Sequence, residues 1–296
     1  SMKYAFYPGC VSRGACPELY PASVKVTEKL GIEIEEVIDV GCTGAGVLSR
    51  DLSDPINART LAKVEAMGLS SLMTICSTCQ GIFTQANHRF KNEPEYREKI
   101  NTEYLAEEGL EYKGTVEVKH LLWVLMEDYG IENLKPHIKR KLTGLKVAPF
   151  YGCYIRRPTA IIAPKGLSGR KTYLEDLIEV IGAEPVDSSG KSKCCGFPIL
   201  TVNEDNSMRM VSDHTGDAKT KGADCMVTPC PLCHLNLDAN QPIAEKKANT
   251  KIEMPIIHLP QLLGLALGFD EKEMDLQRHI VSTEPISRQL EVSIRS

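Results

Sequence analysis

The sequence predicts an α/β protein made of two copies of one unit, each with a mainly parallel sheet flanked by helices. First, one order of cysteines occurs twice along the chain and ends each time in C-x-x-C. Second, the neighbouring residues repeat as well, as in "YPGC" against "FYGC" and "MTICSTCQ" against "VTPCPLCH". Third, short apolar runs alternate with helical patterns, which is typical of parallel sheets. This self-similarity indicates a duplicated unit of roughly 140 residues.

Each copy begins with a predicted strand, a cysteine loop and a helix. Apolar runs that end in Gly-Cys, "KYAFYPGC" and "LKVAPFYGC", predict the strands, and "SVKVTEKLG" and "TYLEDLIEVIG" predict the helices. The C-x-x-C pairs follow "SLMTI" and "CMVTP" and precede the helical patterns "GIFTQANHRF" and "HLNLDANQPIAEKK". Because sites in such sheets collect at the carboxyl ends of the strands, we expect every cysteine group there.

The predicted division of the chain is into two domains and a tail. We place the boundary in the charged stretch from Glu93 to Leu145, which gives domains of residues 2–140 and 141–270. Residues 271–296 form a polar tail, for which a partner-docking role and disorder fit equally well.

Composition limits the classes of function. With 42% hydrophobic residues, 25% charged residues and a net charge of -4, the chain gives no argument for nucleic acid or an anionic membrane as partner. Its longest apolar run, "LPQLLGLALGF", is shorter than the roughly 20 residues that span a bilayer. Eleven cysteines without an export signal favour a cytoplasmic chain with metal or redox chemistry over a disulfide framework. Without a nucleotide-binding motif, its electrons are expected to come from a protein.

The cysteines form two sets. The first contains Cys10, Cys42, Cys76 and Cys79, and the second contains Cys153, Cys194, Cys195, Cys230 and Cys233. A C-x-x-C at a helix N-terminus favours thiolates, although alone it fits a thioredoxin-like pair equally well. The adjacent pair in the second set allows chance burial, a strained disulfide or two ligands of one metal assembly. Five converging thiols are one more than tetrahedral zinc or an ordinary cubane cluster needs, which favours an unusual iron assembly.

The duplicated pattern, with C-C-G in its second copy, resembles the CCG domains in the B-type subunit of heterodisulfide reductase and in its relatives, from about Lys3 to Gly268. The resemblance implies two CCG-type domains and a noncubane [4Fe-4S] cluster that cleaves a disulfide. The second set would hold this cluster, with Cys194 and Cys195 as catalytic ligands to different irons. It also implies two partners, a ferredoxin-like iron-sulfur subunit of the C type and a flavin subunit of the A type. A thiol, a disulfide or a protein-bound sulfur carrier would be the substrate. The cysteine motif resembles equally well that of the heterodisulfide-reductase-like complexes of sulfur-oxidising organisms.

The first copy departs from this family because "GCTGAG" has Thr43 where the second adjacent cysteine belongs. Its four cysteines could hold a conventional iron-sulfur cluster or zinc, and Cys16 could serve as a fifth ligand. We favour ligation by the four cysteines. Gly44 and Gly196, which follow the paired positions, are expected to serve tight turns and close approach of the backbone.

Three cations in the second copy are candidates for binding an anionic substrate group, namely Arg156, Arg157 and Lys193. Their loops also permit an ordinary solvated role.

His120, His234 and His258 are expected to pack and hydrogen-bond, because thiolates suffice for each metal site. The sequence therefore predicts an oxidoreductase subunit that cleaves or forms S-S bonds. The alternative is a non-catalytic binding subunit of the same kind of complex, held by metal or relaying electrons.

Overall fold

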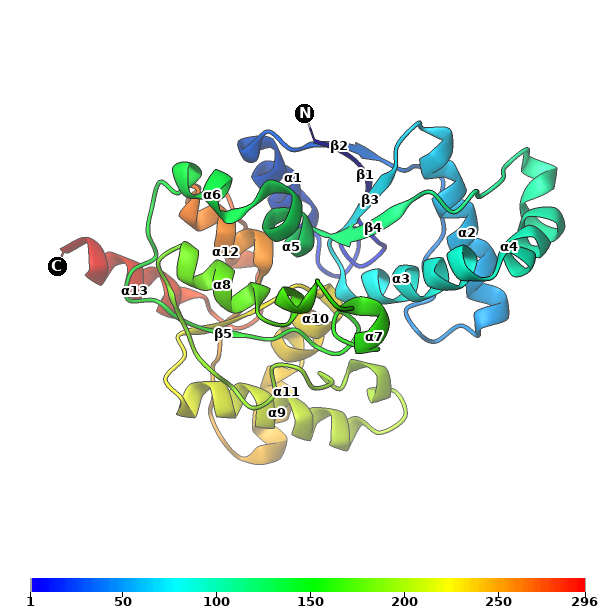
Figure 1. Cartoon of the computed structure of the whole chain (residues 1–296). Coiled ribbons are helices and arrows are strands. Elements are labelled where there is room, and N and C mark those ends of the chain that lie inside the picture. Colours follow the sequence, from blue (N-terminus) through cyan, green and yellow to red (C-terminus); the bar gives the residue numbers. More distant parts are fainter. Residues whose placement is uncertain (1, 296) are drawn as a thin grey trace.

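The computed structural model describes residues 2–295 (Figure 1). They contain two parallel four-stranded sheets whose strands follow the same order. The first sheet has the order β2-β1-β3-β4 and the second β6-β5-β7-β8. All neighbouring strands are parallel. The strands are β1 (Lys3–Tyr7), β2 (Glu33–Glu36), β3 (Ser71–Thr74), β4 (Glu117–His120), β5 (Lys146–Pro149), β6 (Glu184–Pro185), β7 (Cys225–Thr228) and β8 (Ile256–His258). The predicted α/β class and duplication are confirmed.

Helices flank both sheets. Those of the first half are α1 (Leu19–Leu30), α2 (Arg50–Ala66), α3 (Ser77–Asn92), α4 (Pro94–Ile100), α5 (Leu121–Trp123) and α6 (Ile131–Leu134), with the π-helices η1 (Asn101–Leu105) and η3 (Val124–Tyr129). Those of the second half are α7 (Thr159–Ile162), α8 (Tyr173–Val180), α9 (Glu204–Thr220), α10 (Pro231–Ala239), α11 (Gln241–Ala248), α12 (Leu259–Ala266) and α13 (Glu284–Arg295). The 3-10 turns are η2 (Ala106–Glu108), η4 (Lys135–His137), η5 (Ser168–Lys171), η6 (Phe197–Ile199) and η7 (Leu276–Arg278). No helix within residues 2–295 has both the length and the apolar character needed to cross a membrane.

Matching helices and strands of the two copies have the same residue types and backbone conformation at their ends. Cys76 (φ -128°, ψ 118°) and Cys230 (φ -133°, ψ 117°) are extended residues directly before α3 and α10. His120 and His258 end β4 and β8 with nearly equal backbone angles and precede α5 and α12. Helix α1 ends at Gly31, whose φ of 71° suits a left-handed C-cap. The repeat therefore extends to backbone conformation.

The two copies do not bury separate cores. Successive strand residues face opposite sides of a sheet, so each sheet supplies side chains to two cores. Phe6 and Val227 lie in one core with α1, α5, α8 and α12, whereas Tyr7 and Met226 lie in the other. Helix α12 of the second half packs beside α1 of the first (Figure 1). Because both cores contain residues of both sheets, the halves form one packed body.

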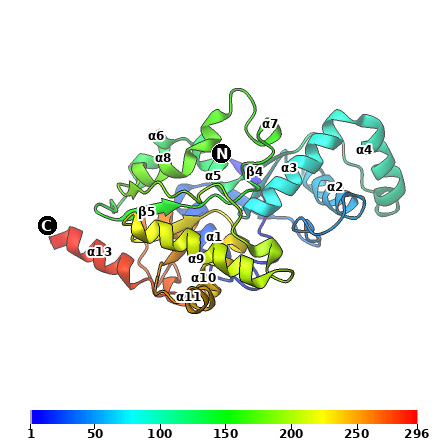
Figure 2. The same ribbon diagram turned by 90° about the horizontal axis from the view of Figure 1, so that it is seen from below.

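The tail beyond residue 270 folds onto this body. Leu276, Ile286 and Leu290 are buried in the core that contains α1 and α12. Helix α13 runs out from the rest of the molecule toward the C-terminus (Figure 2), and Val292 and Ile294 near its end are exposed. Residues 284–295 form helix α13, and burial of Leu276, Ile286 and Leu290 offsets part of the entropy that the tail loses on ordering.

Candidate metal centre

Both cysteine sets lie at the carboxyl edge of their sheets. Cys10 and Cys76 follow β1 and β3, and Cys153 and Cys230 follow β5 and β7. These strand pairs are the points where the order of each sheet reverses, which is where parallel α/β sheets form their ligand crevices. The topology therefore brings together loops that are far apart in the sequence.

The five thiols of the second set form a continuous series of contacts. The Cys194 sulfur is hydrogen-bonded to the thiols of Cys153 and Cys195, which lowers the pKa of Cys194 far below its usual range. The Cys195 thiol also contacts Cys233. A hydrogen bond with Cys233 in turn lowers the pKa of Cys230. An all-sulfur donor set of this kind fits an iron-sulfur cluster, whose binding would displace the remaining thiol protons.

The adjacent cysteines point to different neighbours. Cys194 contacts Cys153 at the rim, whereas the more deeply buried Cys195 also contacts Cys233 of the C-x-x-C pair. All eleven cysteines are free thiols, so the strained disulfide alternative is not what the structure contains. This arrangement suits two neighbouring metal ions of one assembly.

The four thiols of the first set gather in the same way, with Thr43 completing the set. The sulfurs of Cys10 and Cys42 lie 4.0 Å apart. The fully buried Thr43 hydroxyl donates to the Cys79 sulfur over 3.5 Å, as the second cysteine of the adjacent pair contacts its C-x-x-C in the other copy. A hydrogen bond with the Cys76 thiol lowers the pKa of Cys79. A hydroxyl thus takes the place of the fifth sulfur.

The two cysteine sets are in direct contact with each other. The Ser77 backbone N–H donates to the Pro229 carbonyl over 3.1 Å, and the Thr78 hydroxyl lies 3.4 Å from the Cys230 sulfur. The thiols of Cys76 and Cys230 are themselves hydrogen-bonded. Two metal groups held by these sets would therefore be in near contact.

Gly196 has the backbone role that the sequence indicated. Its φ of 92° lies in the left-handed region, and an added Cβ would come within 3.0 Å of the Ser207 side-chain oxygen. The same hydroxyl donates to the Gly196 carbonyl over 2.8 Å. Gly44 has an equivalent φ of 97° in the first copy. Glycine after the paired cysteines lets α9 approach this loop.

Two residues that the sequence analysis missed hold the adjacent cysteines from outside. The Asn236 side chain donates to the Cys195 carbonyl, and His214 Nε2 donates to the Cys194 carbonyl, each over 2.8 Å. Asn236 lies three positions after Cys233 on α10, so helical spacing was a usable signal. No local pattern marks His214, because α9 reaches this loop only through tertiary packing.

A cavity of about 300 Å³ opens onto the second set between the two copies. Its walls are mostly apolar and come from Ala45, Gly46, Val47, Ser77, Thr78, Tyr151, Cys153, Tyr154, Cys194, Cys195, Phe197, Pro198, Leu200, Thr201, Cys230, Leu232 and Cys233. Tyr154 reaches across to the first copy, where Cβ atoms at Gly46 and Gly81 would lie 1.9 Å and 2.6 Å from its atoms. The cavity is large enough for a small apolar molecule or side chain to reach the thiols of the second set.

The three candidate cations lie in different environments. Arg156 stacks at 3.8 Å over the Tyr151 ring and donates to the Lys171 carbonyl, so its guanidinium already has structural partners. Arg157 donates over 3.4 Å to the Ser192 carbonyl near the paired cysteines, and Lys193 is exposed. Arg157 and Lys193 remain accessible to an anionic group, whereas the packing of Arg156 argues against that role.

Cys16 does not lie with the first set. Its buried sulfur is 3.6 Å from the Pro231 carbonyl and 3.9 Å from His234 Nδ1, behind α10. The sequence separation of six residues from Cys10 was misleading, because the intervening turn directs Cys16 toward the second copy.

His120 has the packing role expected of it, since Nε2 donates to the Pro229 carbonyl and Nδ1 caps α5.

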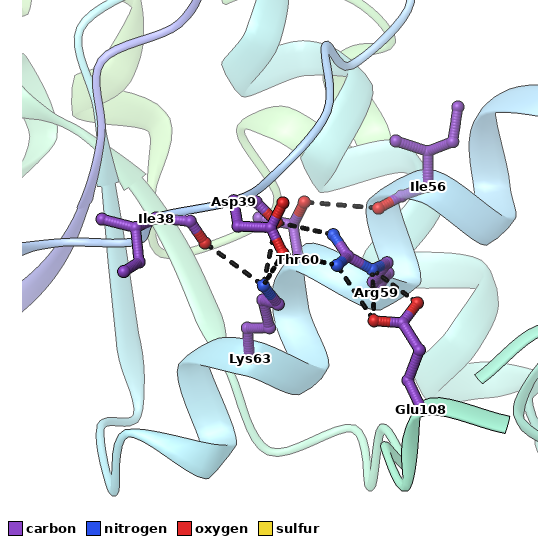
Figure 3. Close-up of polar contacts among 7 residues, drawn as sticks. All are labelled: Ile38, Asp39, Ile56, Arg59, Thr60, Lys63 and Glu108. Atoms are coloured by element: carbon purple, nitrogen blue, oxygen red, sulfur yellow. Dashed lines mark hydrogen bonds and ion pairs between the residues drawn. The ribbon is translucent and has the colours of Figure 1, made fainter. Parts of the chain in front are cut away.

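An ion-pair network on the surface holds the loop that leads to Cys42 (Figure 3). Asp39 has a φ of 53°, which is unfavourable for most side chains. Arg59 donates to the backbone carbonyl of Asp39 over 2.6 Å and to the Asp39 carboxylate over 3.1 Å, and it also binds the Glu108 carboxylate at 2.8 Å. Lys63 binds the same Asp39 carboxylate at 3.1 Å, which lowers the pKa of Asp39.

Replacing Arg59 by alanine is therefore expected to loosen the Cys42 loop. In metal-free protein, a non-specific protease should cleave the loop before Cys42 faster, because cleavage requires local opening of the backbone and removing these bonds favours that opening. Mass spectrometry of the fragments after timed proteolysis measures this rate. Arg288→Ala, which removes an exposed ion pair on α13, is the matched control. Equal cleavage rates of this loop in the wild-type protein and both variants would contradict the role of the network.

Comparison with known proteins shows two matched segments and several full-length relatives. The profile of the CCG cysteine-rich domain matches residues 4–84 and 147–238. The chain is 37% identical, over 94% of its length and 97% of the relative, to the 8-methylmenaquinol:fumarate reductase membrane anchor subunit of Wolinella succinogenes. It is 31% identical to the B-type subunit of the ferredoxin/F(420)H(2)-dependent CoB-CoM heterodisulfide reductase of Methanosarcina acetivorans, over 94% of both chains.

Two further similarities concern a relative and a solved structure. A protein of Archaeoglobus profundus, described as similar to the B-type subunit of heterodisulfide reductase, is 31% identical over 92% of this chain and 93% of the relative. A crystal structure of a hypothetical protein from Helicobacter pylori superposes with a TM-score of 0.74 at 17% identity. That match covers 95% of this chain but only 52% of the Helicobacter chain, and at this identity it supports the fold alone.

Proposed function

The chain belongs to the CCG cysteine-rich domain family, and from this premise we propose that it is the iron-sulfur subunit of a heterodisulfide reductase or heterodisulfide-reductase-like complex. The second copy would hold a noncubane [4Fe-4S] cluster through Cys153, Cys194, Cys195, Cys230 and Cys233. The observation that carries the proposal is the convergence of these five thiols beside an apolar cavity at the carboxyl edge of the sheet.

The residues of the chain have separable roles in this proposal. When bound, the cluster would offer an iron that accepts a substrate sulfur, and it would supply electrons for S-S cleavage or take them up for S-S formation. Asn236 and His214 orient the adjacent cysteines through their carbonyls. The apolar cavity limits water near the thiolates. Arg157 and Lys193 would attract the anionic group of a substrate, a thiol, a disulfide or a protein-bound sulfur carrier.

In the first copy, Cys10, Cys42, Cys76 and Cys79 would hold a second iron-sulfur cluster or zinc. The contact between Cys76 of the first set and Cys230 of the second supports electron transfer between the metal groups that the two sets would hold. By analogy with the named heterodisulfide reductase relatives, we propose two partners, a ferredoxin-like iron-sulfur subunit of the C type and a flavin subunit of the A type. The eleven free thiols support a cytoplasmic location for this assembly.

A second candidate is an electron-relay subunit without sulfur chemistry of its own. Two observations favour it: Thr43 removes one sulfur from the first set, and the 37% identical relative is named as a subunit of a fumarate reductase. In this case both cysteine sets would serve transfer of electrons between partner subunits.

Metal analysis of anaerobically prepared protein separates these candidates. We expect about 8 iron per chain if both sets hold clusters and about 4 if only the second does, with matching acid-labile sulfide. An EPR signal that changes when thiol is added supports substrate binding at iron. A signal that stays the same when thiol is added favours the electron-relay subunit. Absence of iron after anaerobic reconstitution would overturn both.

A further inference from the structure

A third group of metal-ligating side chains lies behind α10, outside both cysteine sets. It contains Cys16 and Glu18 from the turn before α1, His234 from α10 and His258 from the end of β8. One ligand atom from each lies within 4.8 Å of all the others, and all four residues are buried. Such a concentration of thiol, carboxylate and imidazole inside a core is unusual, because each polar group must lose its hydration there.

We propose that Cys16, Glu18, His234 and His258 form a binding site for zinc or a similar divalent ion, separate from the iron-sulfur sites. A thiolate, a carboxylate and two imidazoles are ligands that zinc accepts in tetrahedral geometry. Nε2 of His258 lies 2.8 Å from Glu18 Oε1, and His234 Nδ1 lies 3.9 Å from the Cys16 sulfur. These distances bracket the roughly 3.3–3.6 Å between neighbouring ligands on tetrahedral zinc, as zinc–ligand bonds of about 2.0–2.3 Å require.

The hydrogen bonds around the group direct a free lone pair inward. His234 Nε2 donates to the Ile256 carbonyl over 3.0 Å, so Nδ1, which faces Cys16, carries no proton in the neutral ring. A backbone carbonyl that orients the second nitrogen in this way is typical of histidines that bind metals. The ring therefore already has the tautomer that ligation needs.

His279 provides an independent indication that an ion belongs here. Its Nε2 lies 2.8 Å from Gln261 Oε1, and Gln261 is oriented by Nε2 donating to the Met274 carbonyl and Oε1 accepting from the His258 N–H. The proton is thus on Nε2. His279 Nδ1, in a side chain 1% exposed, has no hydrogen-bond partner among residues 2–295 and lies 3.8 Å from Glu18 Oε1. This buried lone pair is aimed at the group and is available as a further ligand.

Charge balance leads to the same conclusion. Within residues 2–295, the ion pairs of Glu18 are with His258 and His279, and none is with lysine or arginine. A carboxylate that is 5% exposed and lacks a permanent cation is costly, whereas a divalent ion would compensate both Glu18 and a Cys16 thiolate.

The site would join parts of the chain that no local interaction connects. Cys16 and Glu18 come from the first copy, His234 and His258 from the second, and His279 from the tail. An ion held by them would fix α10, whose first turn carries Cys233 next to His234. It would thus act as a structural zinc with a closed ligand set.

Zinc per chain in the anaerobically purified full chain is the first measurement. We expect about one zinc, lost in Cys16→Ala and reduced in Glu18→Gln, with iron unchanged. Cys225→Ala is the matched control, because Cys225 is an equally buried thiol on β7 outside all three groups. Cys42→Ala tests whether zinc instead belongs to the first set.

A chelator experiment tests the zinc site in the wild-type chain itself, so its result does not depend on whether a variant folds. EDTA should lower the melting temperature of the wild-type chain and of Cys225→Ala but leave that of Cys16→Ala unchanged. Wild-type protein without zinc or another non-iron divalent metal would overturn the inference. So would zinc that persists in Cys16→Ala and disappears in Cys42→Ala.

Discussion

Cys195→Ala is expected to lose the iron of the second copy and, with it, turnover of S-S bonds. Cys195 is 4% exposed and contacts both Cys194 and Cys233, so no other thiol can move into its place without disrupting the core. About 4 iron per chain should disappear. Activity should fall by more than about 100-fold, because even residues that only support metal ligands are worth 10–100-fold. Iron analysis and disulfide-reductase assays of the assembled complex measure both effects.

Two controls make this result specific. Cys225→Ala removes a buried thiol outside the cysteine sets and should keep wild-type iron and activity. Cys195→Ser preserves size and tests whether sulfur itself is needed. A Cys195→Ala protein with full iron and an unchanged thiol-sensitive EPR signal would exclude Cys195 as a ligand.

Thr43→Cys is expected to convert the first copy into a five-thiol site. The Thr43 hydroxyl is fully buried and 3.5 Å from the Cys79 sulfur, so a thiol placed there would contact Cys79 as Cys195 contacts the corresponding Cys233 in the second copy. Threonine and cysteine are similar in size, so the core can accept the change. We expect the EPR signature of the second site to appear twice, with total iron of about 8 per chain.

Thr43→Ser is the matched control for this gain. It keeps the hydroxyl that binds Cys79 and should leave the iron content and the EPR spectrum unchanged. If Thr43→Cys also leaves both unchanged and the new thiol is alkylated freely, the first set does not form a pocket for such a cluster.

Local patterns predicted the repeating units well. The apolar runs before Cys76 and Cys230 form β3 and β7, and the helices that follow start at the next residue. Strand and helix periodicity is contained within a few residues, and parallel strands must end at one edge, so convergence of the cysteines followed from their order. The glycine of the C-C-G motif was likewise predictable, because a left-handed φ leaves few other choices.

Contacts between distant segments were beyond such reasoning. The direction of Cys16, the support of Cys194 by His214 and the stacking of Arg156 on Tyr151 depend on how whole elements pack. The buried face of the tail was hidden by its polar composition, although Ile286 and Leu290 lie four residues apart.

The sequence by itself determined two strand-loop-helix units, their cysteine sets and the missing sulfur at Thr43, because spacing and periodicity are properties of neighbouring residues. Only the tertiary structure decided that the two units share both cores, that their thiols meet through Cys76 and Cys230, and that Cys16 faces His234. The physical reason is that these contacts join residues more than a hundred positions apart, whose meeting depends on burying the faces of both sheets together.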